Sequence, residues 1–350
     1  MTYKIGLIAG METTFPDAFI ARVNQNPGYH AELAKIGHTP EIFQARYNVL
    51  IDRLSHEVPF YRFHLKAAAL AGTYVINDPF WWSADEKFFG YSLAAKIGVK
   101  VPRTVMLPSH SYIPSIDPSR SLRNLEYPIA WKELTDYVGF PAILKPADGG
   151  GWKNVYRVDS LEDLWAEYNK TGTLVMTLQE FIDFDDYIRC ICIGKEFILP
   201  IRYNPKVRDH RGFRGAYVET DNPFQSKEIE RQVLDGCWKL NNALGYDMNS
   251  VEWAIKDGVA YAIDFTNPAP DMDLNSILPR YFHIVVDEMA KFAMKVAKDG
   301  RPNHDGYPFR EWIEHPRPRP GSNGVSTEAA PSAAASGSGA KKSGKSEATR

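Results

Sequence analysis

A segment near the middle of the chain combines a lysine with consecutive glycines in a way that suits phosphate binding. The apolar residues 142–145 predict a buried strand that ends at Lys145, and residues 155–158 predict the returning strand. Three glycines stand between them, namely Gly149, Gly150 and Gly151. Their backbone N–H groups could approach a polyphosphate without obstruction, and the lysine would add a point charge. The segment is neither a Walker loop nor a dinucleotide fingerprint. A hairpin tip with a solvent-reaching lysine is the alternative interpretation.

Two carboxylates, Glu252 and Asp264, belong to the predicted strands of one hairpin, residues 251–255 and 259–265. On one sheet face they could hold magnesium, which prefers oxygen ligands and substrate phosphates. A two-residue turn at Asp257-Gly258 would place them on opposite faces, whereas a three-residue loop with a glycine bulge would place them on the same face. The magnesium hypothesis therefore requires the bulge. The alternative is a solvated acidic face followed by an Asn-Pro turn.

A third candidate group follows a predicted strand at residues 174–178. This strand leads into an acidic loop at residues 183–186 through four residues, Gln179, Glu180, Phe181 and Ile182. An adenine ring requires an apolar slot with backbone hydrogen-bonding groups at its edge, and a ribose suits a carboxylate. Taken alone, the segment is better explained as the ordinary exit of a strand.

The first 78 residues alternate between strand and helix patterns, which predicts a small parallel α/β domain. The strands are expected at residues 5–9, 40–43, 48–51 and 73–76, and the helices at residues 15–24 and 61–70. Ligands of such sheets lie beyond the carboxyl ends of the strands, so Asp52, Arg53 and His56 are substrate-site candidates. A solvated loop is an equal alternative for them. A second loop could bind an acidic substrate through three arginines, Arg208, Arg211 and Arg214. A solvated loop is again the alternative.

Composition limits the classes of function. The chain has 350 residues, 44% of them hydrophobic and 24% charged, with a formal net charge of −2. This balance is that of a globular enzyme or binding protein and argues against a nucleic-acid or membrane partner. Three cysteines are too few for a disulfide framework, so we expect reduced thiols and a cytoplasmic location. Residues 316–350 are rich in Gly, Ser, Ala and Pro and predict a disordered tail.

Together and in this order, these motifs resemble the ATP-grasp ligases, a family that includes glutathione synthetase, D-alanine–D-alanine ligase and the ribosomal-protein glutamate ligases. The resemblance covers roughly residues 79–308, and it rests on Ala84 to Lys87, the strand and loop at 140–151, Gln179 to Ile182, and the Glu252–Asp264 pair. It implies an α/β protein, with a small parallel N-terminal domain and a two-subdomain ATP-grasp fold of α+β character whose antiparallel sheets clamp the nucleotide. We expect domain boundaries at 1–78, 79–315 and 316–350, with a lid subdomain at about 140–180.

The resemblance also implies a role for each motif. Lys87 and Lys145 would contact the ATP phosphates under a lid made by Gly149, Gly150 and Gly151. Gln179, Glu180, Phe181 and Ile182 would line the adenine, and Asp186 would bind the ribose, with Asp185 and Tyr187 as alternatives. The metal ligands would be Glu252, Asp264 and Asn267. Arg202 would join Lys145 as a catalytic cation. The family usually has a glutamate at the position of Asp264, and its metal-binding asparagine lies two residues later, where this chain has Thr266 rather than Asn267.

The implied activity is that of an ATP- and magnesium-dependent ligase. It would activate a small-molecule or peptide carboxylate as an acyl phosphate for attack by an amine or a thiol. Two alternatives stay open, a small-molecule kinase with the same fold and a nucleotide-binding module without turnover. The sequence does not identify the carboxylate or the nucleophile. The oligomeric state also stays open, and a homo-oligomer is one of the alternatives.

Overall fold

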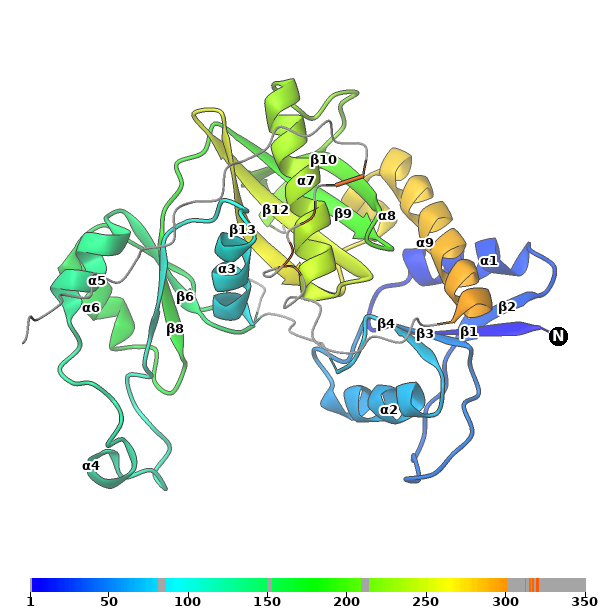
Figure 1. Ribbon diagram of the computed structural model, residues 1–350, viewed down its shortest axis with the longest axis horizontal. Helices are drawn as coiled ribbons and strands as arrows, with labels where there is room; N and C mark the ends of the chain where they lie inside the picture. The colour runs from blue at the N-terminus through cyan, green and yellow to red at the C-terminus, as the bar shows by residue number, and fades with distance from the viewer. Residues whose placement is uncertain are drawn as a thin grey trace, which may run out of the picture.

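The computed structural model describes residues 2–80, 86–149, 153–208 and 214–300, together with residues 312, 315, 317, 319 and 320. Within these residues the chain forms three β-sheets with helices packed on their faces (Figure 1). The expected combination of one parallel sheet followed by two antiparallel sheets is confirmed. No helix in this part of the chain is long and apolar enough to cross a membrane.

The N-terminal sheet is parallel and has the strand order β2-β1-β3-β4. Its strands are β1 (Tyr3–Ile8), β2 (Tyr29–Leu33), β3 (Val49–Asp52) and β4 (Tyr74–Ile76). Helices α1 (Thr14–Asn24) and α9 (Pro279–Asp299) cover one face, and α2 (Pro59–Leu70) covers the other. The strand expected at residues 40–43 is wrong. The strand at the β1 edge of the sheet is β2 instead. Its sequence is mostly polar, with Ala31 as its one buried residue, so it does not show an apolar strand pattern.

A second sheet is antiparallel with the order β5-β8-β6-β7, and it is named the lid sheet because it contains the segment expected to form the lid, at about residues 140–180. Its strands are β5 (Thr104–Leu107), β6 (Ala142–Pro146), β7 (Tyr156–Val158) and β8 (Met176–Glu180). Helices α5 (Trp131–Val138) and α6 (Leu161–Tyr168) pack on one face around Leu144 and Leu178. The short helix α4 (Pro118–Ser121) lies at the end of a long excursion away from this sheet (Figure 1).

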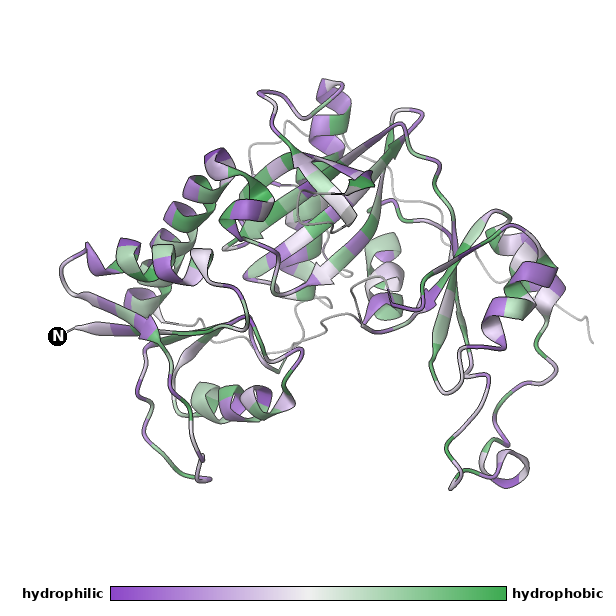
Figure 2. Cartoon of the chain, turned by 180° about the vertical axis from the view of Figure 1, so that it is seen from behind, coloured by the Kyte–Doolittle hydropathy of each residue, from purple (hydrophilic) through white to green (hydrophobic). Residues whose placement is uncertain are grey.

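The central sheet has five antiparallel strands in the order β11-β10-β9-β12-β13. The strands are β9 (Asp186–Ile193), β10 (Phe197–Arg208), β11 (Arg214–Val218), β12 (Met248–Lys256) and β13 (Val259–Asn267). Helices α3 (Lys87–Lys96) and α7 (Lys227–Leu244) cover one face, on which Cys190, Cys192 and Trp253 are buried. The other face packs against α9 at the end nearest the N-terminal domain, where the small helix α8 (Leu274–Ile277) also lies. Figure 2 shows long apolar stretches on the central strands.

Candidate functional site

The β12–β13 hairpin places Glu252 and Asp264 opposite each other. Near the turn, Lys256 pairs with Val259 and Trp253 pairs with Ala262, so the turn itself has two residues. Asp257 and Gly258 both have positive φ, as such a turn requires. Of the two alternatives that the sequence left open, the structure has the two-residue turn and not the three-residue loop. The two carboxylates still share one face, because Ile263 is an extra residue in β13 that shifts the register beyond it.

A second irregularity in β13 brings Asn267 onto the face that carries the two carboxylates. Asn267 pairs with Ser250, two residues from Glu252, although it follows Asp264 by three. Its Nδ2 donates to Ser250 Oγ at 3.1 Å. Thr266 is 2% exposed and packs toward α3, where a Cβ on Gly90 would lie 3.3 Å from its Cγ2. Of the two residues left open by the sequence, Asn267 is thus the one on the carboxylate face.

Two lysines from different elements face the Glu252–Asp264 pair. Lys87 begins α3, and its Nζ lies 3.4 Å from Asp264 Oδ2. The Asp264 side chain is 41% exposed, and its partial desolvation opposes ionisation, yet the charges of Lys87 and Lys145 outweigh this effect and hold the pKa of the carboxyl below its ordinary value. Lys145 lies near the end of β6, and desolvation lowers its pKa to about 8 despite the opposing charge of Asp264.

Arg189 on β9 is a site residue that the sequence analysis missed. It pairs with Glu252 across the sheet, and its NH2 lies 2.8 Å from Glu252 Oε1. Tyr187 donates a hydrogen bond to the same carboxylate. The guanidinium also stacks over the ring of Tyr203, and its Nε is buried without a hydrogen-bond partner among the described residues. Strand alternation was the available signal, because Arg189 is charged between the apolar Ile188 and Cys190.

Arg202 and Asp186 do not join this group. Arg202 pairs with Ile188 in the sheet, so it lies on the face covered by α7, opposite to Glu252. Its guanidinium makes a bidentate ion pair with Asp186, with distances of 2.9 and 2.6 Å. Asp186 is only 7% exposed. The structure thus does not bring Arg202 and Asp186 together with the Glu252–Asp264 pair, and it places Arg189 beside Glu252 instead.

The remaining sequence candidates lie at or just beyond the ends of β8 and β6, the two inner strands of the lid sheet. The Glu180 carboxylate is held by Arg103, with Nε to Oε2 at 3.0 Å. Gln179 accepts from Lys145, and Ile182 is buried in an apolar cluster with Tyr187 and Ala254. Phe181 lies beneath the guanidinium of Arg157. Gly149 is exposed and has a φ of 86°, which favours glycine. Gly150, Gly151 and Arg211 lie outside the described residues, as do the side chains of Arg208 and Arg214.

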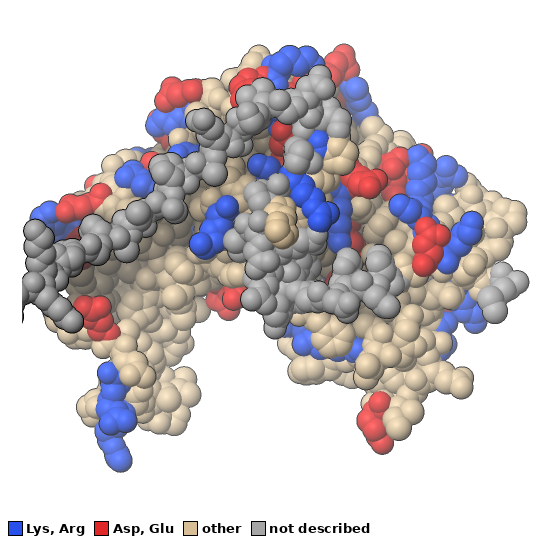
Figure 3. Space-filling model, in the orientation of Figure 1, with Lys and Arg blue, Asp and Glu red and all other residues tan. Residues whose placement is uncertain are grey.

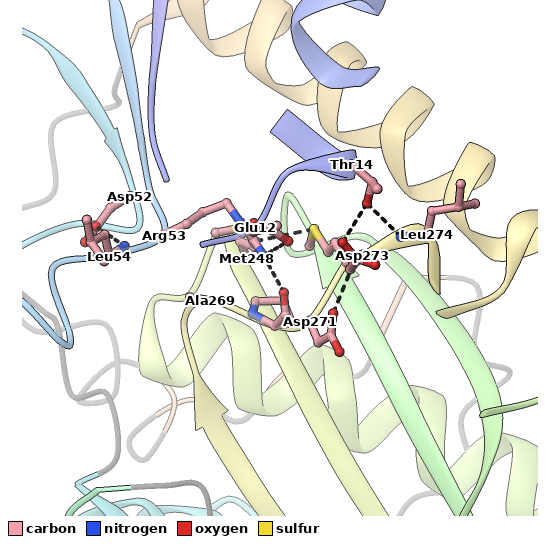
Figure 4. Close-up of polar contacts among 12 residues, drawn as sticks. Glu12, Thr14, Asp52, Arg53, Leu54, Met248, Ala269, Asp271, Asp273 and Leu274 are labelled. Atoms are coloured by element: carbon pink, nitrogen blue, oxygen red, sulfur yellow. Dashed lines mark hydrogen bonds and ion pairs between the residues drawn. The ribbon is translucent and has the colours of Figure 1, made fainter. Parts of the chain in front are cut away.

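Two of the three substrate candidates in the N-terminal domain, Asp52 and Arg53, are buried (Figure 4). Arg53 is 7% exposed and binds Glu12 through two contacts of 2.5 and 2.7 Å. It also donates to the carbonyl of Pro270, in the segment that follows β13. Asp52 accepts from the backbone and hydroxyl of Ser55. Arg53 thus connects the N-terminal domain to the central sheet. His56 faces Glu57 at 3.9 Å.

Removal of the Arg53 charge is expected to destabilise the fold. Arg53→Met would leave the Glu12 carboxylate without its cation in a largely buried position, at a loss of about 3 kcal/mol. The measurement is the free energy of unfolding in urea. The control is Arg22→Met, whose ion pair with Asp287 is nearly half exposed on both sides and should contribute about 0.5 kcal/mol. Equal losses for both variants would contradict the structural role of Arg53.

Comparison with known proteins supports this architecture. No family model matches the chain. A D-alanine–D-alanine ligase A of Bacillus cereus is 28% identical over 171 residues, which are 43% of this chain and 54% of that protein. The chain thus spans about half the length of this curated relative. The solved VanG D-Ala:D-Ser ligase of Enterococcus faecalis superposes with a TM-score of 0.62 at 13% identity, covering 85% of this chain and 100% of that chain. A solved RimK domain protein from Sphaerobacter thermophilus, described as ATP-grasp, superposes with a TM-score of 0.55 at 16% identity, covering 83% of this chain and 99% of that chain.

Proposed function

We propose that this chain, whose three sheets form the ATP-grasp fold, is an ATP- and magnesium-dependent ligase that activates a carboxylate for attack by an amine. One observation carries the proposal. Two lysines and two carboxylates from four separate elements, α3, β6, β12 and β13, converge on one face of the central sheet, beside the lid. In Figure 3 the surface is hollowed between the lobe with α4 and the lobe with α2. Curated relatives that are named D-alanine–D-alanine ligases support an amine as the acceptor.

The acidic residues fit a magnesium ion that is bound together with substrate phosphates. Among the described residues there is no cluster of three or more His, Cys, Asp or Glu that could hold a metal alone. Glu252 and Asp264 supply two carboxylates, and Asn267 adds an amide on the same face. Magnesium usually takes one or two carboxylates and completes its shell with phosphate and water. When bound, the ion would neutralise phosphate charge and orient the phosphates for transfer.

The nucleotide would lie between the lid and the central sheet. Lys87 and Lys145 would bind phosphate oxygens, and the loop that begins at Gly149 would close over them. An apolar surface where β8 leaves the lid would receive the adenine, formed by Ile182, Ala254 and Ile263. Because Asp186 is paired with Arg202, the ribose would have to find another partner. Asp185 is exposed in the same segment and is the better candidate.

The chemistry would be phosphoryl transfer from ATP to the carboxylate, followed by attack of the amine on the acyl phosphate. Such a reaction depends on positioning and charge stabilisation more than on covalent catalysis by the protein. Lys145 and Arg189 would offset the charge that develops on the transferred group. Closure of the lid would exclude water, which otherwise hydrolyses the acyl phosphate.

The proposal is tested by incubating the full chain with ATP, magnesium chloride and panels of carboxylates and amines, D-amino acids and small peptides included. ADP release that requires both a carboxylate and an amine, with a condensed product seen by mass spectrometry, is the expected result. A phosphorylated product without condensation would indicate a kinase. ATP binding without any turnover across the panels would indicate a nucleotide-binding module.

Arg189 and Arg202 give a direct test of which arginine serves the reaction. Arg189→Met is expected to lower kcat by about a thousandfold, because it removes the cation next to Glu252. Arg202→Met should leave kcat within about threefold, since its ion pair lies on the other face of the sheet. Steady-state ADP release and thermal melting of both variants are the measurements. The reverse order of effects would restore the sequence-based assignment to Arg202.

A further inference from the structure

We propose that Tyr91 is a positioning residue, which sets Lys145 of the lid at a fixed place relative to the Asp264 carboxylate of β13. This inference rests on the proposed function and assigns part of the phosphate-binding geometry to a residue outside the motifs of the sequence analysis. Tyr91 lies on α3, one turn after Lys87, so both side chains project from the same side of the helix. It is 4% exposed.

The Tyr91 hydroxyl connects the lid to the central sheet. It accepts a hydrogen bond from Lys145 Nζ at 2.7 Å and donates one to the carbonyl of Ile263 at 2.6 Å. Ile263 is the extra residue of β13 and immediately precedes Asp264. One hydroxyl group thus joins the strand that carries the lysine to the bulge that places the carboxylate.

The hydrogen-bonding capacity of the groups supports a positioning role. A tyrosine hydroxyl has a single proton, and here that proton is used on Ile263. Lys145 must therefore be the donor in its contact with Tyr91. Its second described contact is with Gln179 Oε1 at 2.9 Å, and Gln179 is itself oriented by a bond to Thr104 Oγ1. An ammonium group has three N–H bonds, so these two contacts leave one N–H to point at a phosphate oxygen.

Close packing holds Tyr91 against the central sheet. Its ring meets Phe265 edge to face, with centroids 5.4 Å apart. Gly90 makes this approach possible, because a Cβ at that position would lie 3.1 Å from the Phe265 ring. Helix α3 is also fixed to the lid, since the N–H of Lys87 donates to the carbonyl of Ala147, just after β6. The helix therefore bridges the two sheets, and Tyr91 is a rigid contact at its middle.

The test compares Tyr91→Phe with Tyr168→Phe. The control Tyr168 is equally buried, lies in the lid core and donates to the carbonyl of Pro108, away from the proposed site. In Tyr91→Phe we expect the KM for ATP to rise about tenfold and kcat to fall by a similar factor, because a charge-assisted hydrogen bond is lost. In Tyr168→Phe both constants should stay within about twofold per folded molecule.

The pH profile is a readout that a purely structural role would not move. The groups that act on Lys145 are Asp264 and Glu252 on the hairpin, which favour its charged form, and Lys87 on α3, which disfavours it. Loss of the hydroxyl removes a bond to the charged form, so the decline of kcat/KM at alkaline pH should begin at a lower pH in Tyr91→Phe. Tyr168→Phe should keep the wild-type profile.

A second variant keeps the test decisive where Tyr91→Phe is too unstable to assay. Gln179→Met removes the other described acceptor of Lys145, and we expect the same direction of change in both constants. Wild-type kinetic constants and pH profile in both variants would overturn the inference, as would losses that only follow the fraction of unfolded protein. Failure of the wild-type chain to bind or turn over ATP would refute the proposed function instead.

Discussion

Lys145→Ala is expected to reduce ATP turnover by about a thousandfold or more, while the chain still folds. The ammonium group is the lid's contribution to the site and is already set by Tyr91 and Gln179. Its removal would leave Lys87 as the one lysine proposed to bind the phosphates and would remove a charge that helps keep Asp264 ionised. The fold should survive because the alanine leaves the strand pairing of β6 with β8 intact.

The measurement is ADP release together with binding of a non-hydrolysable ATP analogue by calorimetry. Lys132→Ala is the matched control, because this lysine is on helix α5 of the lid, is 86% exposed and pairs with Asp136 on the same helix. It should retain wild-type turnover. Undiminished ADP release by Lys145→Ala would exclude the phosphate-binding role. The pKa of Lys145, about 8, also predicts the direction of the pH dependence. Before ATP binds, Lys145 loses its charge as the pH rises through that value, so the affinity for ATP should fall there.

The sequence predicted those parts of the site that lie on one continuous segment. Lys145 could be placed because a short apolar run followed by Pro146 and glycines has few other interpretations. The Glu252–Asp264 hairpin could be placed because Asp257-Gly258 is a strong turn signal. Each of these features depends on local patterns, which act over a few residues and are visible without tertiary structure.

The sheet face on which a given side chain lies was harder to predict, because it depends on the register with neighbouring strands. Ile263 shifts the register of β13, and no residue type in β13 marks it as an insertion. Arg202 was proposed and Arg189 was missed for the same reason, since both arginines are on apolar strands and only the pairing of β9 with β12 shows which one meets Glu252. A one-residue error in such an argument moves a side chain to the opposite face.

Amphipathic patterns were also incomplete as guides to burial. Residues 61–70 show an apolar stripe at helical spacing that contains Phe63 and Leu70, yet these side chains are 70% and 85% exposed. Helix α2 instead buries Leu65 and Ala68 against the sheet. Small residues allow the helix to approach the strands closely, and the choice between two apolar stripes is made by tertiary packing.

Asp264→Asn is expected to raise the magnesium concentration needed for half-maximal activity by about a hundredfold and to lower kcat strongly. The amide has the shape of the carboxylate but lacks its charge, so the ion would keep only Glu252 as an anionic protein ligand. The pKa of Asp264 lies below its ordinary value, so the wild-type group is ionised throughout the neutral range. A change of pH between 6 and 8 should therefore not reproduce the higher magnesium requirement in the wild-type chain, because this range lies roughly two or more units above the usual pKa of an aspartate.

Asp257→Asn is the matched control, because it makes the same chemical change in the same hairpin. Asp257 lies at the turn with a φ of 49°, a conformation that asparagine also tolerates. Magnesium titrations of both variants, followed by ADP release, distinguish a metal ligand from a carboxylate that does not bind the metal. If Asp264→Asn and Asp257→Asn gave the same titration as the wild-type chain, the two opposed carboxylates would be a structural pair held by Lys87 and Arg189. The fold would then retain a nucleotide site whose metal is bound elsewhere.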